Sequence, residues 1–170
     1  MTDPELAQRL LEEEQEREDL KERLEREHEE LLHELRSVIP GAQVLFGFLL
    51  AIRFTNQFEE LDDTQRNVYY FALLATATAL VCFMAPAAYH RLRFRTGDKE
   101  FMLQKGNREA VAGTVAIALA FTAVLFLVTD FVFDTPEAIL AAAVLLAVIV
   151  WRWWALAVIR AWQDRRDGVS

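Results

Sequence analysis

Four long apolar runs dominate the chain after its first 37 residues, and short polar stretches separate them. Each run holds few charged side chains, and a helix needs about 20 mostly apolar residues to cross a bilayer core of roughly 30 Å. The runs therefore predict an all-α integral membrane protein, a four-helix bundle over residues 38–162 with a tail at 163–170. We place the four spans at about residues 38–57, 67–89, 109–130 and 136–160.

The first 37 residues, called here the acidic arm, follow a different pattern. Asp3, Pro4 and Glu5 are typical of a helix start, since Asp is a favoured N-cap and Pro fits the first helical position. Between Glu5 and Arg36 the chain has neither glycine nor proline, and charged residues and leucine predominate. The pattern predicts a long charged N-terminal helix. Pro40 removes a backbone donor and crowds the preceding turn, so we expect a break or kink before the first span.

Leucines recur on one face of the arm. Their spacings of 4, 7 and 4 residues place them on one side of a helix, but Glu27 interrupts the heptad pattern of a coiled coil. Two alternatives stay open. The arm is either a solvated single helix with a thin leucine stripe, or a helix that pairs or docks through residues 5–36, with another copy or a cytoplasmic protein as candidate partners. The leucines are Leu20, Leu24, Leu31 and Leu35.

The net charge of −8 belongs entirely to the arm. The first 36 residues contain 14 acidic and six basic side chains, whereas the other 134 residues contain 12 of each. The acidic balance therefore describes one appendage, and we expect no nucleic-acid partner. The lone cysteine, Cys82, excludes a disulfide within the chain.

Basic residues near the spans set the expected orientation. Six of them lie between Arg91 and Arg108, and others precede the first span and follow the last. The loops after the first and third spans carry acids and a single base, Arg66. Because basic residues favour the cytoplasmic side, we expect a multi-pass plasma-membrane protein with both termini and the central loop in the cytoplasm.

Two groups of residues at the expected cytoplasmic face are candidate sites. The first, the basic island, is expected to contact anionic headgroups or the acidic arm, although its charges also suffice to set the topology. It consists of His90, Arg91, Arg93, Arg95 and Lys99. The second group, at the end of the fourth span, is typical of an interfacial anchor. It consists of Trp151, Arg152, Trp153, Trp154 and Trp162.

A third candidate group lies at the expected outer ends of two spans. Arg53 lies near the end of the first span, and Asp130 is expected to end the third. An acid at a helix C-terminus opposes the helix dipole and should seek a cation. We therefore predict that Arg53 forms an ion pair with Asp130, or with Asp134, across the outer end of the bundle.

Several phrases of the sequence are similar to those of a known family. They are PGAQVLFGFLL at 40–50, Gln65-Arg66 before Tyr69-Tyr70, APAAYHR at 85–91 and Val128-Thr129-Asp130. Over about residues 34–133 the chain resembles a family of small bacterial four-span membrane proteins of unknown function. Some of its members carry an automatic sodium:proton antiporter label. The resemblance implies a bacterial inner-membrane protein, supplies no catalytic residues, and leaves the acidic arm and the tryptophan-rich tail outside the family.

The chemistry inside the predicted spans separates the function classes. Proton-coupled cation exchange generally needs a titratable group within the membrane. The apolar cores of the spans contain no Asp, Glu, Lys or His; these cores are residues 41–54, 68–88, 110–129 and 138–159. The sequence also lacks a metal-ligand cluster, a nucleophile with its base and a phosphate-binding glycine loop.

We therefore expect no enzyme, metal or cofactor. We interpret the chain as a structural or interaction protein that anchors a charged cytoplasmic helix. The alternative is a cation/proton antiporter or another small-solute transporter that acts as an oligomer, because four spans in one chain would need further copies to enclose a path.

Overall fold

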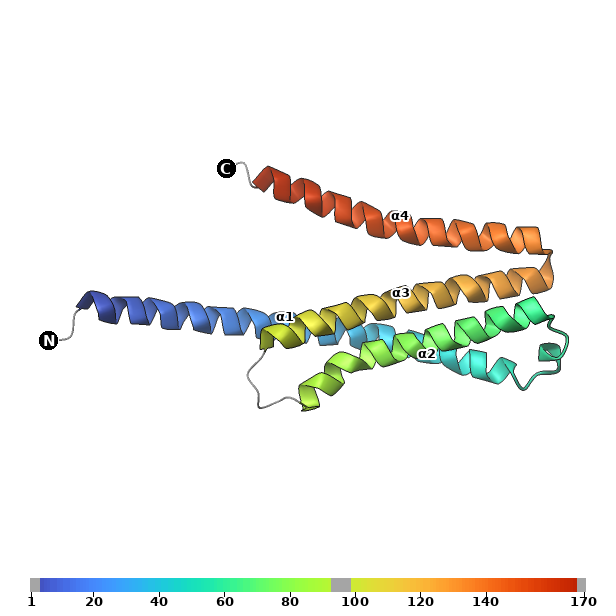
Figure 1. Ribbon diagram of the computed structural model, residues 1–170, viewed down its shortest axis with the longest axis horizontal. Helices are drawn as coiled ribbons and strands as arrows, with labels where there is room; N and C mark the ends of the chain where they lie inside the picture. Colours follow the sequence, from blue (N-terminus) through green and yellow to red (C-terminus); the bar gives the residue numbers. More distant parts are fainter. Residues whose placement is uncertain (1–3, 93–98, 168–170) are drawn as a thin grey trace. The chain divides into compact units, whose positions relative to one another are not determined.

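The computed structural model describes the backbone of residues 4–92 and 99–167. It describes the side chains of residues 8–89, except 10, 21 and 28, and of residues 104–153. All regular structure in this part of the chain is helical, which confirms the predicted all-α class. The elements are α1 (Pro4–Ile52), the short 3₁₀ helix η1 (Asn56–Phe58), α2 (Asp63–Leu92), α3 (Lys99–Val132) and α4 (Thr135–Asp167) (Figure 1).

The four α-helices are each long and apolar enough to cross a membrane. The segments that meet this description are Leu11–Ile52, Asp63–Tyr89, Gln104–Val132 and Thr135–Trp153. Helix α4 begins after Asp134: the Ala138 backbone N–H donates to the Asp134 carbonyl at 3.2 Å, and Glu137 lies in the first turn. A negatively charged side chain in the first turn is stabilised by the positive end of the helix dipole.

Two helices run through positions where the sequence predicts an interruption. Of the break or kink expected at Pro40, the break is wrong, because α1 continues through this proline to Ile52; the kink stays a prediction. A proline removes only one helical hydrogen bond, because it has no N–H to donate to the carbonyl four residues earlier, here that of Arg36. The side chains of Arg36 and Pro40 are both exposed, so solvent can reach this carbonyl in place of the missing donor. Similarly, Asp130 does not end its helix, since α3 continues to Val132.

The chain divides into two compact units, and helices α1, α2 and α3 contribute to both. The arm unit comprises residues 1–43 and 80–113, and the turn unit comprises residues 44–79 and 114–170. Buried side chains of the arm unit come from all three helices: Leu35 and Ala42 from α1, Phe83 and Pro86 from α2, and Ala110 from α3.

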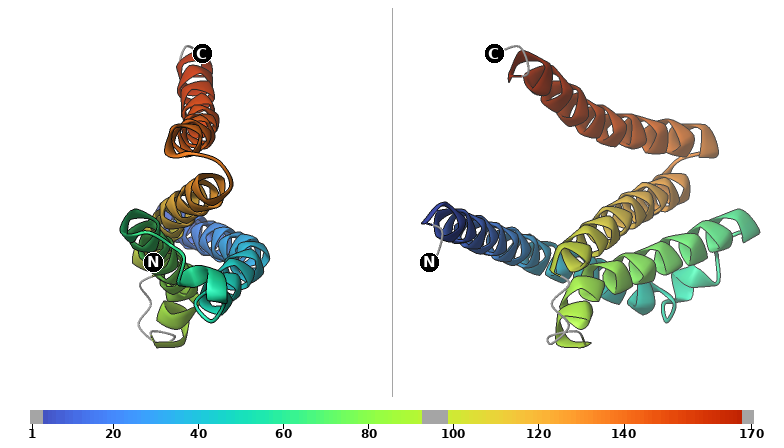
Figure 2. Two further views of the ribbon diagram at one scale, coloured as in Figure 1. Left: turned by 90° about the vertical axis from the view of Figure 1, so that its right-hand side faces the viewer. Right: turned by 60° about the vertical axis from the view of Figure 1, so that its left-hand side comes forward.

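The core of the turn unit lies where the ends of α1 and α2 meet α3. Its buried side chains form one cluster, which comprises Leu49, Phe58, Leu61, Tyr69, Ala72, Ala123 and Leu127. Small residues at the contacts let helix backbones approach closely, which is how membrane helices associate when lipid is as apolar as the protein. The α1–α2 turn and the shorter α3–α4 connection both belong to this unit (Figure 2).

Helix α4 has little contact with the rest of the turn unit. Among its described side chains, up to residue 153, Ala138 is the one buried residue. Most of its described large apolar side chains are exposed, namely Ile139, Leu140, Val144, Leu146, Val148, Val150, Trp151 and Trp153. A soluble protein rarely exposes a continuous apolar face of this size, so the surface is suited to hydrocarbon.

Candidate functional site

The end of α1 is closed by hydrogen bonds that satisfy its last carbonyl groups. The Tyr69 hydroxyl donates to the Leu49 carbonyl at 2.9 Å, and this bond is buried. The Thr55 hydroxyl donates to the Ile52 carbonyl at 2.8 Å, and the Phe54 backbone N–H donates to the Ala51 carbonyl at 3.0 Å. Unsatisfied carbonyls cost several kcal/mol in hydrocarbon, so these donors allow α1 to end next to the apolar core.

The 3₁₀ helix η1 places Phe58 between an aromatic ring and a cation. The rings of Phe58 and Tyr69 meet edge to face, with centroids 4.9 Å apart. On the Phe58 ring, the Arg53 guanidinium carbon lies 4.5 Å from the centroid. This geometry is a cation–π contact, because the negative face of the ring attracts the guanidinium charge. The connection after α1 is thus anchored by one buried aromatic side chain.

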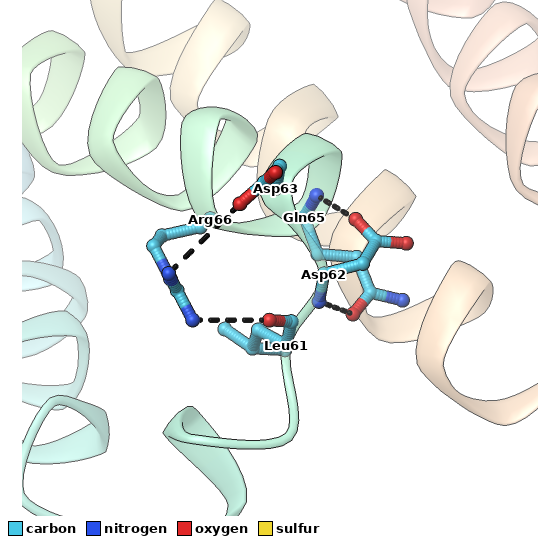
Figure 3. A network of polar contacts seen from close by, with 5 residues as sticks. All are labelled: Leu61, Asp62, Asp63, Gln65 and Arg66. Atoms are coloured by element: carbon cyan, nitrogen blue, oxygen red, sulfur yellow. Dashed lines mark hydrogen bonds and ion pairs between the residues drawn. The ribbon is translucent and has the colours of Figure 1, made fainter.

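A reciprocal capping box starts α2. The Asp62 carboxylate accepts from the Gln65 backbone N–H at 2.8 Å, and the Gln65 side-chain oxygen accepts from the Asp62 backbone N–H at 3.2 Å (Figure 3). Two helix donors are satisfied in this way. Close by, the Arg66 guanidinium donates to the Leu61 carbonyl at 3.2 Å and lies 4.0 Å from the Asp63 carboxylate. We call residues 61–66 together with Asp130 the polar turn.

The capping box is also tied to α3. The side-chain amide N–H (Nε2) of Gln65 donates to the Asp130 carboxylate at 2.8 Å. The other carboxylate oxygen of Asp130, Oδ1, is buried and has no hydrogen-bond partner, and the same holds for Nε of Arg66. A single side chain, Gln65, therefore caps one helix and holds a second.

The predicted ion pair between Arg53 and Asp130 or Asp134 does not form. Arg53 instead lies on Phe58, and Asp130 accepts from Gln65. The physical reason is that Asp130, in the last turn of α3, faces the start of α2, where the neutral amide of Gln65 supplies the donor in place of a cation. Asp134 is exposed in the α3–α4 connection, where its carbonyl group starts α4. The Asp62-x-x-Gln65 spacing before an apolar run identifies Gln65 as a capping residue, but it carries no signal for the bond to Asp130.

In the arm unit, the arm contacts α2 and α3 at a glycine. A Cβ atom added at Gly106 would lie 3.3 Å from Cδ2 of Leu31, and 3.5 Å from Cβ of Pro86. The absence of a side chain at residue 106 thus makes room for the arm leucine. We call this place, where Leu31 and Pro86 both lie next to Gly106, the arm notch.

Polar groups border the arm notch on α2 and α3. The Lys105 ammonium nitrogen lies 4.5 Å from the centroid of the Tyr89 ring, within the range of a cation–π contact. One turn further along α3 lies Glu109, and Cys82 lies on α2 one turn before Pro86. Cys82 and Glu109 are both half-buried.

The other predicted site residues divide into two groups. Trp151, Arg152 and Trp153 are exposed on α4, and their role as an interfacial anchor stays a prediction. The remaining side chains lie outside the described residues; they are those of Trp154 and Trp162 and of the basic island, His90, Arg91, Arg93, Arg95 and Lys99.

The chemistry available in the described residues is limited. No group of three or more His, Cys, Asp or Glu side chains is placed to hold a metal ion in the part of the chain that was searched. Three threonines within the candidate spans donate to carbonyls of their own helices: Thr76 to Ala72, Thr78 to Leu74 and Thr122 to Ala118. Their hydroxyl protons are thus engaged locally and do not link one helix to another.

Two carboxylates of α3 lie next to the apolar core that the sequence indicates for its span, residues 110–129. Glu109 and Asp130 lie within the candidate span Gln104–Val132, one residue outside the core assumed from the sequence at each end. The two acids therefore flank the apolar core of α3, one at each end.

Comparison with known proteins places the chain in a family without assigning it an activity. No curated protein and no solved structure matches it. Residues 17–157 match the model of a family of unknown function, DUF6328. This match is wider than the resemblance over residues 34–133, since it includes half of the acidic arm and most of α4, which were expected to lie outside. The chain therefore belongs to the family of unknown function DUF6328.

Proposed function

We propose that this protein is a membrane-embedded interaction protein, in which the helical bundle anchors the acidic arm for contact with a partner. The observation that carries the proposal is the continuity of α1, which runs without a break from the charged arm into the first candidate span. A continuous helix transmits the position of the bundle to the arm, whereas a flexible linker would not. The arm notch adds a second point of attachment through Leu31.

The exposure of the arm supports the same role. All side chains from Leu11 to Leu20 are exposed, and burial begins only towards the leucines near the notch. An exposed helix rich in acids contributes little to the stability of the bundle, so its length is better explained by contact with another molecule. The proposed role is non-catalytic.

The proposal includes an orientation in the bacterial plasma membrane. Both termini and the central loop face the cytoplasm, which places the arm in that compartment. The basic island then lies against anionic headgroups, where each cation contributes about 1 kcal/mol near the surface. The support for this orientation is the excess of basic residues in the central loop over the outer loops.

The test removes the arm and follows both the fold and the contact. A photo-crosslinking residue at Glu16 is expected to give a discrete protein adduct in the native membrane, and the same residue at Val150 on the exposed apolar face of α4 is the control. Truncation of residues 1–24 should remove the binding surface and leave the arm notch and the unfolding transition of the bundle unchanged. Equal adducts from both positions, or only lipid adducts from Glu16, would contradict the proposal.

A second candidate function is cation or proton transport by an oligomer. The observation that favours it is the presence of Glu109 and Asp130 within one candidate span, because carboxylates there are costly and often functional. The test is a sodium- or potassium-dependent pH change in vesicles that contain the purified protein. It should disappear in the variant that combines Glu109→Gln with Asp130→Asn. A rate equal to that of protein-free vesicles eliminates this candidate.

A further inference from the structure

The leucine face of the arm is covered at one end and bare at the other. Leu35 is buried, Leu31 and Leu24 are half-buried, and Leu20 is 55% exposed. At 3.6 residues per turn, all four lie within about 60° of one another around the helix axis. The face that carries Leu31 into the arm notch therefore continues towards the N-terminus as an uncovered surface.

Charged side chains surround this uncovered surface. Glu13, Glu16 and Glu27 lie seven and four residues before Leu20 and seven residues after it, so they share its side of the helix. Arg17 and Arg23, three residues before and after Leu20, flank the same side, and all five charged side chains are exposed. Across residues 11–30 the sequence has eleven acids and four bases, a net charge of −7. An apolar side chain on a helix with this negative balance is the pattern that a complementary, positively charged partner would cover.

Charge selects among the molecules that could cover this face. A second copy of the arm would bring two segments of net charge −7 together, and like charges across an interface oppose association. The anionic surface of a cytoplasmic leaflet would repel the arm for the same reason. A cationic helix is attracted, and the spacing of the leucines matches the ridges that pack one helix on another.

We propose that the face of α1 centred on Leu20 binds a cationic amphipathic helix of a protein partner. The apolar stripe of the partner packs on Leu20, and its Lys and Arg side chains pair with Glu13, Glu16 and Glu27. This inference rests on the proposed function, since it names the chemistry of the partner that the arm contacts. An amphipathic helix binds in this way through apolar side chains that recur at helical spacing along one of its faces.

The test uses a synthetic helical peptide of Lys and Leu with one apolar face, and the full chain in nanodiscs of phosphatidylcholine. Empty nanodiscs and a Glu/Leu peptide of the same pattern are the controls for membrane and charge. Leu20→Ser should weaken Kd by about fivefold to tenfold, because a buried leucine contact is lost. Leu11→Ser is the matched control, since Leu11 is 62% exposed and lies on the opposite side of the helix; it should leave Kd unchanged.

A second pair of variants separates the face from net charge alone. Glu13→Gln with Glu16→Gln should weaken Kd by at least about threefold, as expected for two exposed ion pairs. Glu18→Gln with Glu22→Gln removes the same charge from the opposite side and should change Kd much less. Equal loss in both pairs would overturn the proposal, because non-specific attraction to an acidic helix would then explain the binding.

Three further outcomes would also overturn it. One is binding of the Glu/Leu peptide as tight as that of the Lys/Leu peptide. Another is a disulfide between two copies of a Leu20→Cys variant, which would make a second copy the occupant. The third is a gain of more than tenfold in peptide affinity when Arg91, Arg93 and Arg95 are replaced by Gln, which would make the chain's own loop the occupant. A protein adduct from Glu16 together with any of these outcomes leaves the proposed function standing and removes only this inference.

Discussion

The arm notch and the polar turn both hold α1 against α2 and α3, but they do so by different chemistry. At the arm notch the contacts are apolar, with Leu31 packed at Gly106 and Pro86. At the polar turn a capping box starts α2 and an amide–carboxylate bond joins α2 to α3, and next to it the buried Tyr69 hydroxyl joins α2 to α1. Separation of the notch exposes only hydrocarbon, whereas separation of the turn leaves buried polar groups without partners.

This difference has a physical consequence in a membrane. An unsatisfied polar group in hydrocarbon costs several kcal/mol, so the polar turn resists opening. Detachment of the arm loses the burial of a few apolar side chains such as Leu31, at about 1.5–3 kcal/mol for a fully buried leucine, and leaves no buried polar group without a partner, so the arm can detach at lower cost. We therefore expect the turn unit to be the stable part of the molecule and the arm to be the adjustable part. Three variants test this comparison.

The largest effect is expected for Tyr69→Ala. Tyr69 is almost completely buried, contacts Phe58 edge to face and donates to the Leu49 carbonyl. Its loss creates a cavity and leaves that carbonyl without its donor, at a combined cost of about 3 kcal/mol or more in unfolding free energy. Unfolding in mixed micelles measures this cost. Phe71→Ala, on a half-exposed ring of the same helix, is the control and should cost much less; equal costs would mean that the turn unit is not tightly packed.

An intermediate effect, confined to the arm unit, is expected for Gly106→Val. The new side chain would collide with Leu31 and Pro86, and overpacking of this kind costs about 1–3 kcal/mol. Hydrogen exchange at residues 31–35 should accelerate, while exchange around Tyr69 stays as in the parent protein. Gly41→Val is the matched control, because a Cβ there meets nothing within 4 Å. Faster exchange around Tyr69 as well would show that the notch and the turn are not independent.

The smallest effect is the coupling between Gln65 and Asp130. Alanine at either position removes the 2.8 Å bond, and a double-mutant cycle should give a coupling free energy of about 1 kcal/mol. Arg53 supplies the comparison: Arg53→Ala and Asp130→Ala should be additive, since Arg53 lies on Phe58. Coupling between Arg53 and Asp130 would mean that the ion pair predicted from the sequence forms in the membrane after all.

Part of the polar turn could be anticipated from sequence and part could not. The Asp62-x-x-Gln65 spacing announces a capping box, because both reciprocal bonds are local and depend on helix geometry alone. The bond from Gln65 to Asp130 spans 65 positions in the chain, and it depends on how α2 and α3 are rotated about their axes. No local pattern encodes that rotation, and the expectation for Asp130 failed for this reason.

The arm shows the same division. Its helical character and its leucine face follow from residue spacing, and they hold in the structure. The special position of Gly106 does not follow from its neighbours, since a glycine in a helix is equally compatible with an interruption, with an open surface or with a close contact. Only the positions of Leu31 and Pro86 next to Gly106 show that this glycine serves a close contact.

By itself, the sequence determined that the protein has four helices long and apolar enough to cross a membrane, preceded by an acidic helical arm. Apolar length and charge periodicity act locally, and tertiary context rarely overrides them over 20 or more residues. The tertiary structure decided that α1 continues through Pro40 and that Leu31 lies next to Gly106. It also decided that Arg53 contacts the Phe58 ring and that Asp130 accepts a hydrogen bond from Gln65. Those outcomes depend on which side chains two distant helices bring within a few ångströms, and the energy differences between such alternatives are only about 1 kcal/mol.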